Sequence, residues 1–551
     1  VTEQGTTRLT VPFVVTGADA VAVDVVLTLP DGRRLSQSHS IDVRRNDPVI
    51  QRRSQFALAS GGTFTLDQNA FAGFVEGSAS VTLAAGPLAQ FDVPGLLNAL
   101  DKYPYGCTEQ VTSKALPLLY LDQVASAMGL ENRDGIAERI SQSISLVLTN
   151  QASNGAFGLW RPDRGDLWLD AYVTDFLSRA KATGHDVPDI AFRQAINNLR
   201  NQVNSASDFE NGGEGLAYAM LVLAREGAAS IGDLRYYADT KANDFATALA
   251  VAQLGAALAS YGDPTRADAM FRRAATLLDK APDDAQVWRD DYGTDLRDTA
   301  AVLTLAVEAG SSVMNIPQLS ARIAPSIGEV VGRSTQESVW TLLAANALLD
   351  RPMSGLSLNG ESVSGPLVKV LDEEAGEPVE ISNASGEETT VTLTAFGVSD
   401  EPVAAGGNGY RIKRDYYDLD GNPVDARRVT SGTRLVAVLT VIPLATGEAR
   451  LMVSDPLPAG FEIDNPNLLR SGDVKALPWL DTDANVRNSE FRDDRFLAAV
   501  DHYGTKEFQL AYILRAVAPG EYHHPAASVE DMYRPFYRAR TDEGRVEVAA
   551  Q

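Results

Sequence analysis

The sequence predicts a multidomain protein of mixed α and β structure, in which a helical (α/α)6 toroid interrupts β-rich segments. Three observations lead to this prediction. At 551 residues and 59.0 kDa, the chain is too long for one ordinary hydrophobic core. Its hydrophobic content of 44% and charged content of 22% are those of a folded protein. Strand-like alternation marks both ends of the chain, whereas helical periodicity fills residues 93–350.

Two β-rich segments begin the sequence. Residues 20–29 carry apolar side chains in a strand-like pattern before a Pro-Asp-Gly turn, which predicts two strands joined by that turn. Residues 78–83 alternate in the same way. We therefore expect one β unit over residues 1–46 and the first half of another over 47–92.

The central block is expected to be helical. Nearly uncharged segments such as 246–258 alternate with amphipathic ones such as 266–274, which implies two concentric layers of helices. A closed toroid fits this pattern. An open superhelix is the alternative, but its repeats of roughly 40 residues would be more regular. The expected helices cover 107–128, 133–149, 167–183, 189–203, 213–226, 243–260, 264–280, 293–309, 316–330 and 335–349.

Strand patterns return after residue 350. Residues 390–396 alternate within the segment 351–402, and the glycine-rich residues 406–409 read as a linker. Residues 433–441 then form a clear strand. These patterns predict a terminal β unit over 403–551.

Cys107 is the only cysteine in the chain, and it lies in the stretch Tyr103 to Gln110. Pro104 and Gly106 disfavour helix before it, so Cys107 is expected at a helix N-terminus, where amides and the helix dipole favour a thiolate. Attack of the sulfur on the Gln110 side-chain carbonyl would expel ammonia and close an internal thioester. A lone cysteine is more often a small buried hydrophobe, so composition alone favours the simpler interpretation.

The motif changes that balance, because Tyr103 to Gln110 resembles the thioester signature of the α-macroglobulin and complement superfamily. Its Gly-Cys-x-Glu-Gln core is intact, and the flanking Tyr-Pro-Tyr is typical of bacterial α-macroglobulins. Further stretches at 151–160, 167–173, 292–300 and 334–340 also resemble the family, and Asp170 stands in the second of them where the family has threonine. Packing is the simpler interpretation of these four. Residues 455–462 and 532–535 resemble the terminal domain of bacterial members.

The resemblance covers essentially the whole chain and implies a domain order. It implies the end of a macroglobulin-like β-sandwich at 1–46, and a CUB-type β-domain in two halves at 47–92 and 351–402. A thioester domain at 93–350 is inserted between these halves. A terminal macroglobulin-like β-sandwich follows at 403–551.

A thioester needs shelter from water until it is used. We expect Tyr103 and Tyr105 to cover one side of Cys107 and Gln110. A loop carrying Met532 and Tyr533 is expected to close the other side, with an exposed turn as the alternative. The attacking group would be a lysine amine of a captured protein, and the trap would react once, so the protein is not an enzyme.

Charge and composition exclude several classes of partner. A net charge of −25 argues against nucleic acid, and no apolar run is long enough to cross a bilayer. Residues 1–30 do not resemble a signal peptide, and the chain begins as if it were part of a longer protein. No cofactor or metal site is expected from the motifs. His185 lies in a loop without a family motif, so amines are expected to react in preference to hydroxyls.

The resemblance implies a bacterial protease inhibitor that tethers attacking proteases of a host or competitor. It also implies a monomer in the periplasm or cell envelope, held at the inner membrane by an N-terminal lipid anchor outside this sequence. Two alternatives remain open. One is a thioester-bearing surface adhesin, and the other is an (α/α)6-barrel enzyme, which requires an acidic or metal site lining its barrel.

Overall fold

The protein is described by a computed structural model. The described residues are 11, 20–43, 47, 49–127, 133–164, 166–206, 208–209, 212–280, 289–326, 332–348, 355–363, 367–373, 378–464, 474, 477–480 and 482–550. The chain divides into two compact units, residues 1–48 and residues 49–551.

The first unit contains the β-hairpin expected near the start of the chain. Strands β1 (Ala20–Thr28) and β2 (Arg34–Asp42) pair antiparallel, with Val21 opposite Ile41 and Leu27 opposite Leu35. Gly32 sits in the turn at a φ of +82°, a conformation that favours glycine.

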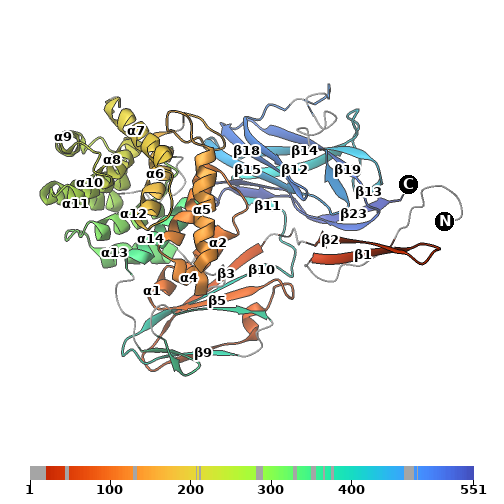
Figure 1. The fold of residues 1–551 in the computed structure, drawn as a ribbon, viewed down its shortest axis with the longest axis horizontal. Helices are drawn as coiled ribbons and strands as arrows, with labels where there is room; N and C mark the ends of the chain where they lie inside the picture. The colour runs from red at the N-terminus through yellow and green to blue at the C-terminus, as the bar shows by residue number, and fades with distance from the viewer. Residues whose placement is uncertain are drawn as a thin grey trace. The chain divides into compact units, whose positions relative to one another are not determined.

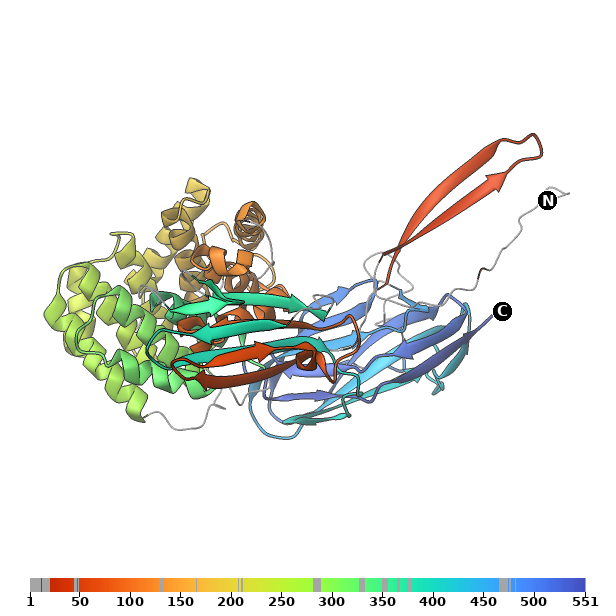
Figure 2. The same cartoon turned by 90° about the horizontal axis from the view of Figure 1, so that it is seen from below.

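The second unit begins with a two-sheet β-sandwich built from two separate parts of the chain. Figure 2 shows these parts, red to orange and green to teal, side by side in the sandwich. Buried Val81, Leu83, Ile381 and Val391 join them in one core. One sheet has the order β3 (Val49–Leu58), β10 (Thr389–Val398), β5 (Ser80–Ala85) and β8 (Leu367–Asp372). The other has the order β4 (Thr63–Leu66), β9 (Val379–Asn383), β6 (Leu356–Leu358) and β7 (Glu361–Ser362).

All the described α-helices lie between β5 and β6 in the sequence, so they form one insertion into this sandwich (Figure 1). Of the described helices, none has both the length and the apolar character needed to cross a bilayer. Their bounds are α1 (Pro87–Gln90), α2 (Val93–Asp101), α3 (Thr108–Ala115), α4 (Asp122–Ala127), α5 (Arg133–Thr149), α6 (Leu167–Ala182), α7 (Asp189–Asn204), α8 (Glu214–Arg225), α9 (Ile231–Tyr236), α10 (Ala248–Ser260), α11 (Pro264–Lys280), α12 (Asp295–Glu308), α13 (Ile316–Ser326) and α14 (Thr335–Ala347).

The helices form the two-layered ring that the periodicity predicted. Within the described residues, α3, α6, α8, α10, α12 and α14 contact one another in that order, and α14 returns to α3 and closes the ring. Helices α5, α7, α11 and α13 pack against this inner ring. The inner α10 is buried from Ala248 to Leu258, whereas the outer α11 buries one face only. The closed toroid is therefore confirmed over the open superhelix.

Some helix boundaries differ from the prediction. The helix expected over 107–128 breaks at Leu116–Leu119, a 3₁₀ turn whose Pro117 has no N–H to donate. The helix expected from 243 begins at Ala248, after its N-cap Thr247. Helices α2 and α9 were not predicted, and residues 128, 327–330 and 349 of three expected helices lie outside the described residues.

The end of the chain forms a larger β-sandwich around its own core. Its strands are β11 (Gly406–Asn408), β12 (Tyr410–Tyr417), β13 (Arg428–Thr430), β14 (Arg434–Pro443), β15 (Glu448–Pro456), β16 (Phe461–Ile463), β17 (Val486–Phe491), β18 (Arg495–Tyr503), β19 (Phe508–Ala516), β20 (Gly520–His524), β21 (Ser528–Asp531), β22 (Arg538–Arg540) and β23 (Gly544–Ala549). The six-stranded sheet β11-β22-β21-β15-β18-β17 includes the strand that leads to Met532. This sheet brings the segment that follows β21 to the helical domain.

Candidate functional site

Cys107 is the N-cap of helix α3, at the end of the non-helical segment that Pro104 and Gly106 begin. The loop that follows α5 fixes the first turn of α3. The N–H of Thr108 donates to the carbonyl of Leu159 at 2.8 Å, and its hydroxyl donates to that of Gly158 at 2.6 Å. Cys107 itself has no exposed surface.

Cys107 and Gln110 face each other across this first turn. The backbone N–H of Cys107 donates to Oε1 of Gln110 at 3.1 Å, while the sulfur receives the backbone N–H of Gln110. Such reciprocal capping holds a residue and its i+3 neighbour on one side of a helix end. The buried thiol and carboxamide are therefore held together, as the motif predicted.

Two tyrosines before the helix flank this pair. Tyr103 and Tyr105 are half-buried, and their rings meet edge to face with centroids 5.3 Å apart. Nε2 of Gln110 lies 3.5 Å from the Tyr103 hydroxyl. Lys114, one turn further along α3, donates to the backbone carbonyl of Tyr103 and holds the segment against the helix.

The terminal β-sandwich supplies the opposite side. Met532 and Tyr533 follow strand β21 and are each 3% exposed. The Met532 sulfur accepts from Nε2 of Gln110 at 3.4 Å, although 422 positions separate the two residues. The alternative of an exposed turn is therefore wrong for these residues.

Tyr533 makes the widest set of contacts in this cover. Its ring meets that of Tyr292 edge to face at 4.6 Å, and the Arg450 guanidinium lies 4.2 Å from the Tyr292 ring centroid. Its hydroxyl donates to Oε2 of Glu109 at 3.2 Å, and the side chain lies close enough to the Cys107 thiol to act on its pKa. Tyr292 and Arg450 were not predicted as site residues, although the motif at 292–300 contained a signal for the first.

Glu109 is a further residue of the site that was not predicted from the sequence. Its carboxylate has no exposed surface, and its side-chain partners are the neutral residues Ser113, Thr335, Gln336 and Tyr533. Burial raises the pKa of this carboxyl, and the four hydrogen-bond donors oppose that rise.

Burial also reverses the electrostatic expectation for Cys107. Desolvation raises the pKa of the thiol, and the neighbouring Glu109 raises it further. The N–H groups of Gln110 and Glu109 act in the opposite direction, as expected for a helix N-terminus, but they do not outweigh burial. The expectation of a thiolate is therefore wrong for this closed arrangement.

The contacts of Asp170 explain why an aspartate stands here in place of the threonine of the family pattern. One carboxylate oxygen accepts the N–H of Phe157 at 2.6 Å, and the other accepts from Asn198 and Gln202. It therefore ties the loop that holds Thr108 to helix α7. Desolvation raises its pKa to about 6.

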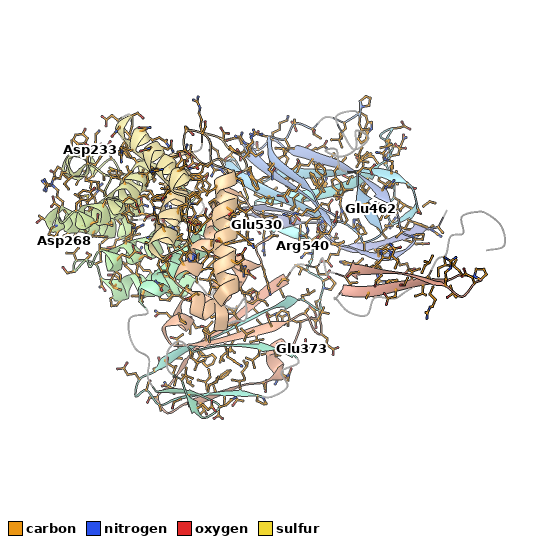
Figure 3. The ribbon with its side chains drawn as sticks, viewed as in Figure 1. Asp233, Asp268, Glu373, Glu462, Glu530 and Arg540 are labelled. Carbon is orange, nitrogen blue, oxygen red and sulfur yellow. The ribbon has the colours of Figure 1, made fainter. Side chains whose placement is uncertain are left out.

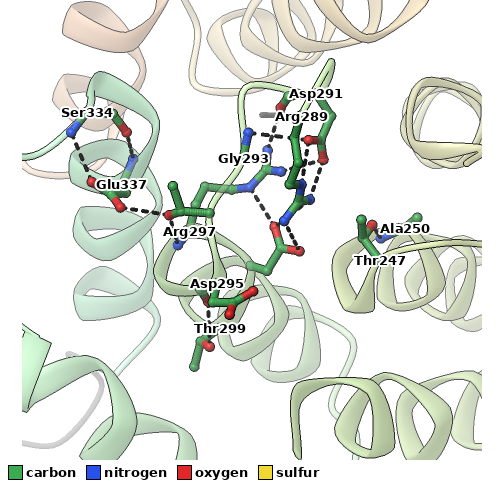
Figure 4. Close-up of polar contacts among 12 residues, drawn as sticks. Thr247, Ala250, Arg289, Asp291, Gly293, Asp295, Arg297, Thr299, Ser334 and Glu337 are labelled. Carbon is green, nitrogen blue, oxygen red and sulfur yellow. Dashed lines mark hydrogen bonds and ion pairs between the residues drawn. The ribbon is translucent and has the colours of Figure 1, made fainter. Parts of the chain in front are cut away.

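The acidic residues near 290 are part of an ion-pair cluster (Figure 4). Asp291 accepts from Arg289 and from Arg297, both at 2.6 Å, and Asp298 accepts from Arg297 at 2.8 Å. Arg297 has no exposed surface. Asp283 and Asp284, the other acidic pair in this region, lie outside the described residues.

Two domain families match this sequence. The A-macroglobulin TED domain matches residues 81–221, and the Bacterial Alpha-2-macroglobulin MG10 domain matches residues 409–535. Alpha-2-macroglobulin of Escherichia coli strain K12 is 31% identical over 93% of this chain and 32% of its own length. The chain thus spans about a third of the length of this curated relative.

Solved structures are similar over nearly the whole chain. The crystal structure of native E. coli alpha-2-macroglobulin from domain MG7 to the C-terminus is 28% identical, with a TM-score of 0.83. The match covers 97% of this chain and 88% of that one. Salmonella alpha-2-macroglobulin reacted with methylamine is also 28% identical, with a TM-score of 0.83 over 97% of this chain and 36% of that one.

Proposed function

This chain belongs to the bacterial alpha-2-macroglobulin family, and we propose that it carries the covalent trap of a protease inhibitor. The trap is an internal thioester between Cys107 and Gln110. A protease that brings a lysine amine to this bond becomes attached through a stable amide.

The observation that carries this proposal is the contact between Cys107 and Gln110. Their side chains lie on one helix turn, and both are fully buried. The Cys107 N–H already donates to the oxygen of the carbonyl group that the sulfur would attack. That hydrogen bond polarises the carbonyl and would stabilise the charge that develops on its oxygen. An unreactive buried cysteine would need no carboxamide held against it.

The cover supports a switchable trap. Tyr103 belongs to the helical domain, whereas Met532 belongs to the terminal sandwich, and both contact Nε2 of Gln110. Separation of the two domains would remove half of this cover and admit an amine. Water excluded until that moment cannot hydrolyse the bond.

Two buried acids of the toroid are held by arginine, which weakens the barrel-enzyme alternative. Asp175 pairs with Arg179 and Arg225, and Asp291 pairs with Arg289 and Arg297. Carboxylates held in this way by arginine are not available as metal ligands or general bases. Single-turnover acylation of a captured protease therefore remains the reaction that the site supports best.

Amines are the proposed targets, because His185 lies in the loop after α6 and no histidine of the described helical domain contacts Cys107 or Gln110. By family membership we also propose that the whole protein acts as a monomer in the periplasm or cell envelope. Tethering at the inner membrane is part of the same proposal.

Intact mass spectrometry before and after methylamine tests the proposed trap. A closed thioester makes the chain lighter by one ammonia, and methylamine then adds its own mass and releases one thiol. The Cys107→Ala variant should show the unmodified mass and no response to methylamine. A wild-type chain of unmodified mass that ignores methylamine would contradict the proposal.

A further inference from the structure

Glu109 lies between Cys107 and Gln110 in the sequence, and its side chain is fully buried. Its carboxyl group faces neither a cation nor solvent. Oε1 accepts from Ser113 and Gln336, both at 2.6 Å, and Oε2 accepts from Tyr533 at 3.2 Å. The Thr335 hydroxyl reaches both oxygens at 2.9 and 3.0 Å. Four donors satisfy an ionised carboxylate, which can only accept hydrogen bonds.

The same cage can also hold Glu109 in its protonated form. Oε1 of Gln336 is buried and has no hydrogen-bond partner. A protonated Glu109 could donate to that oxygen after a rotation of the Gln336 amide group. A buried carboxyl that finds partners in both protonation states is suited to receive and return a proton.

Tyr533 lies beside both this carboxyl and the reacting sulfur. Its hydroxyl donates to Oε2 of Glu109, and the same buried side chain is close enough to the Cys107 thiol to act on the pKa of that thiol. On the other side, Ser113 hydrogen bonds to both Glu109 and the Tyr172 hydroxyl, the latter at 2.8 Å. The line from Cys107 to Glu109 therefore crosses from the helical domain to the terminal sandwich and back.

We propose that Glu109 receives the Cys107 thiol proton through Tyr533 while the thioester forms. This inference rests on the thioester proposed above and assigns a positioning residue to it. The S–H proton moves to the Tyr533 oxygen as the phenolic proton moves to Glu109, and the sulfur bonds to the side-chain carbonyl carbon of Gln110. The carbon–nitrogen bond then breaks. The nitrogen leaves as ammonia with the proton that Glu109 gives up, so Glu109 ends unchanged.

This relay makes thioester formation depend on the docked state. Tyr533 belongs to the terminal sandwich, so the path is complete only while that domain covers the site. Once the domains separate, Glu109 loses its connection to the sulfur. The freed thiol then has only solvent to take its proton, so Glu109 no longer assists re-closure after a protease has been captured.

The test compares thioester closure in Glu109→Gln and Tyr533→Phe with matched controls. Glu308→Gln changes a carboxyl elsewhere in the helical domain, and Tyr512→Phe removes a buried hydroxyl that donates to Asp455 at 2.8 Å in the terminal sandwich. Closure is followed by intact mass after ammonium has cleaved the thioester and been removed. We expect wild type and controls to close, and both test variants to close about 100-fold more slowly or not at all.

The pH dependence separates proton transfer from a merely structural role. Wild-type closure should slow as pH falls through the pKa of Glu109, because the ionised carboxylate is the acceptor. The other titratable groups near it are Tyr103, Tyr172, Tyr533 and Cys107, and burial raises the pKa of each above its already alkaline ordinary value. These groups therefore stay neutral over this range, and Glu109→Gln should lack the dependence.

Wild-type closure rates in both test variants would overturn the relay and leave the thioester itself intact. Should Glu109→Gln fail to fold, Tyr533→Phe decides alone, because it keeps the ring that packs on Tyr292. Faster loss by hydrolysis is recognised by a carboxylate at position 110 in the peptide mass, and counts against the relay. Failure of wild type to lose ammonia would instead reject the proposed trap.

Discussion

At the scale of single residues, burial decides the chemistry of the site. Cys107 sits where a helix end favours the thiolate, yet desolvation raises its thiol pKa. A buried thioester avoids this conflict, because its sulfur carries no proton and no charge. The sulfur becomes a good leaving group only when opening of the cover admits water, so leaving-group quality and exposure change together.

Removing one side of the cover should shorten the life of the thioester. Tyr103→Gly and Met532→Gly each delete a contact to Nε2 of Gln110. Loss of a buried side chain costs about 2–5 kcal/mol, and 1.4 kcal/mol is tenfold in an equilibrium, so methylamine should react at least about tenfold faster. Thiol release against time measures this rate. Met314→Gly is the control, since Met314 is buried away from Gln110 in the loop between α12 and α13, and an unchanged lifetime in both test variants would refute shielding.

Asp170 should make the stability of the helical domain depend on pH. Its pKa rises from 3.8 to about 6 in the folded state, chiefly by desolvation, so the folded state holds the proton more tightly than the unfolded one. This contribution is therefore fully present below pH 4 and is lost as pH rises through 6. The free energy of unfolding of wild type, minus that of Asp170→Asn, should fall by about 2 kcal/mol from about pH 4.5 to 7.

Denaturant unfolding across this pH range measures that difference. Asp233→Asn is the control, since Asp233 lies exposed on α9 (Figure 3) and should show no such change. A difference between wild type and Asp170→Asn that stays constant with pH would reject the assignment.

At the scale of elements, the thioester turn is held by its neighbours more than by its own helix. Helix α3 is short, and its first turn depends on the loop around Gly158 and on α14. The N-terminus of α14 is fixed by a capping box between Ser334 and Glu337, which presents Thr335 and Gln336 to Glu109. The ring of inner helices thus positions the site.

The buried ion cluster at the start of α12 should be one of the strongest supports of that ring (Figure 4). Arg297→Met removes the fully buried cation that Asp291 and Asp298 share and leaves them only the more exposed Arg289, which should cost about 3–5 kcal/mol in unfolding free energy. Denaturant unfolding followed by circular dichroism measures this loss. Arg322→Met breaks the surface pair with Asp279 and should cost less than about 1 kcal/mol. Equal losses in the two variants would contradict the assignment.

At the scale of the whole molecule, the site exists because two domains meet over it. The terminal sandwich contributes Met532 and Tyr533, and Arg492 donates to the carbonyl of Pro104 at 3.4 Å. Glu530, labelled in Figure 3, lies on the preceding strand β21 and acts electrostatically on Tyr103 and Tyr105. Because Glu530 is a titratable acid at this contact, docking of the two domains depends on pH.

Docking should weaken as Glu530 ionises. Burial raises its pKa from 4.5 to about 7, with Asp531 adding to the rise and Arg538 opposing it. The docked form therefore holds the proton more tightly, and its stability falls as pH rises from 4.5 through 7. The rate of methylamine attack on wild type, divided by that on Glu530→Gln, should rise by up to about tenfold between about pH 5 and 8. Partial exposure limits this effect.

Dividing the two rates at each pH removes the titration of methylamine itself, because both proteins meet the same concentration of free amine. A rate ratio that does not change with pH would show that Glu530 has no part in docking.

Sequence patterns were sufficient for the closed toroid, because its periodicity is set by which face of each helix is buried. They failed at short elements such as α2 and α9, where a few residues carry little periodic signal, and at Pro117, where a local effect broke a longer pattern. The Cys107–Gln110 pairing was also accessible from the sequence, since i and i+3 meet on any helix turn.

The sequence by itself determined the order of β-rich and helical segments and the two reacting side chains, because both depend on local spacing along the chain. Only the tertiary structure decided that Met532 contacts Gln110, that Tyr533 lies beside both Cys107 and Glu109, and that burial raises the pKa of the thiol. Contacts across more than 400 positions and the loss of hydration at their centre arise from how whole domains pack, and no local pattern encodes them.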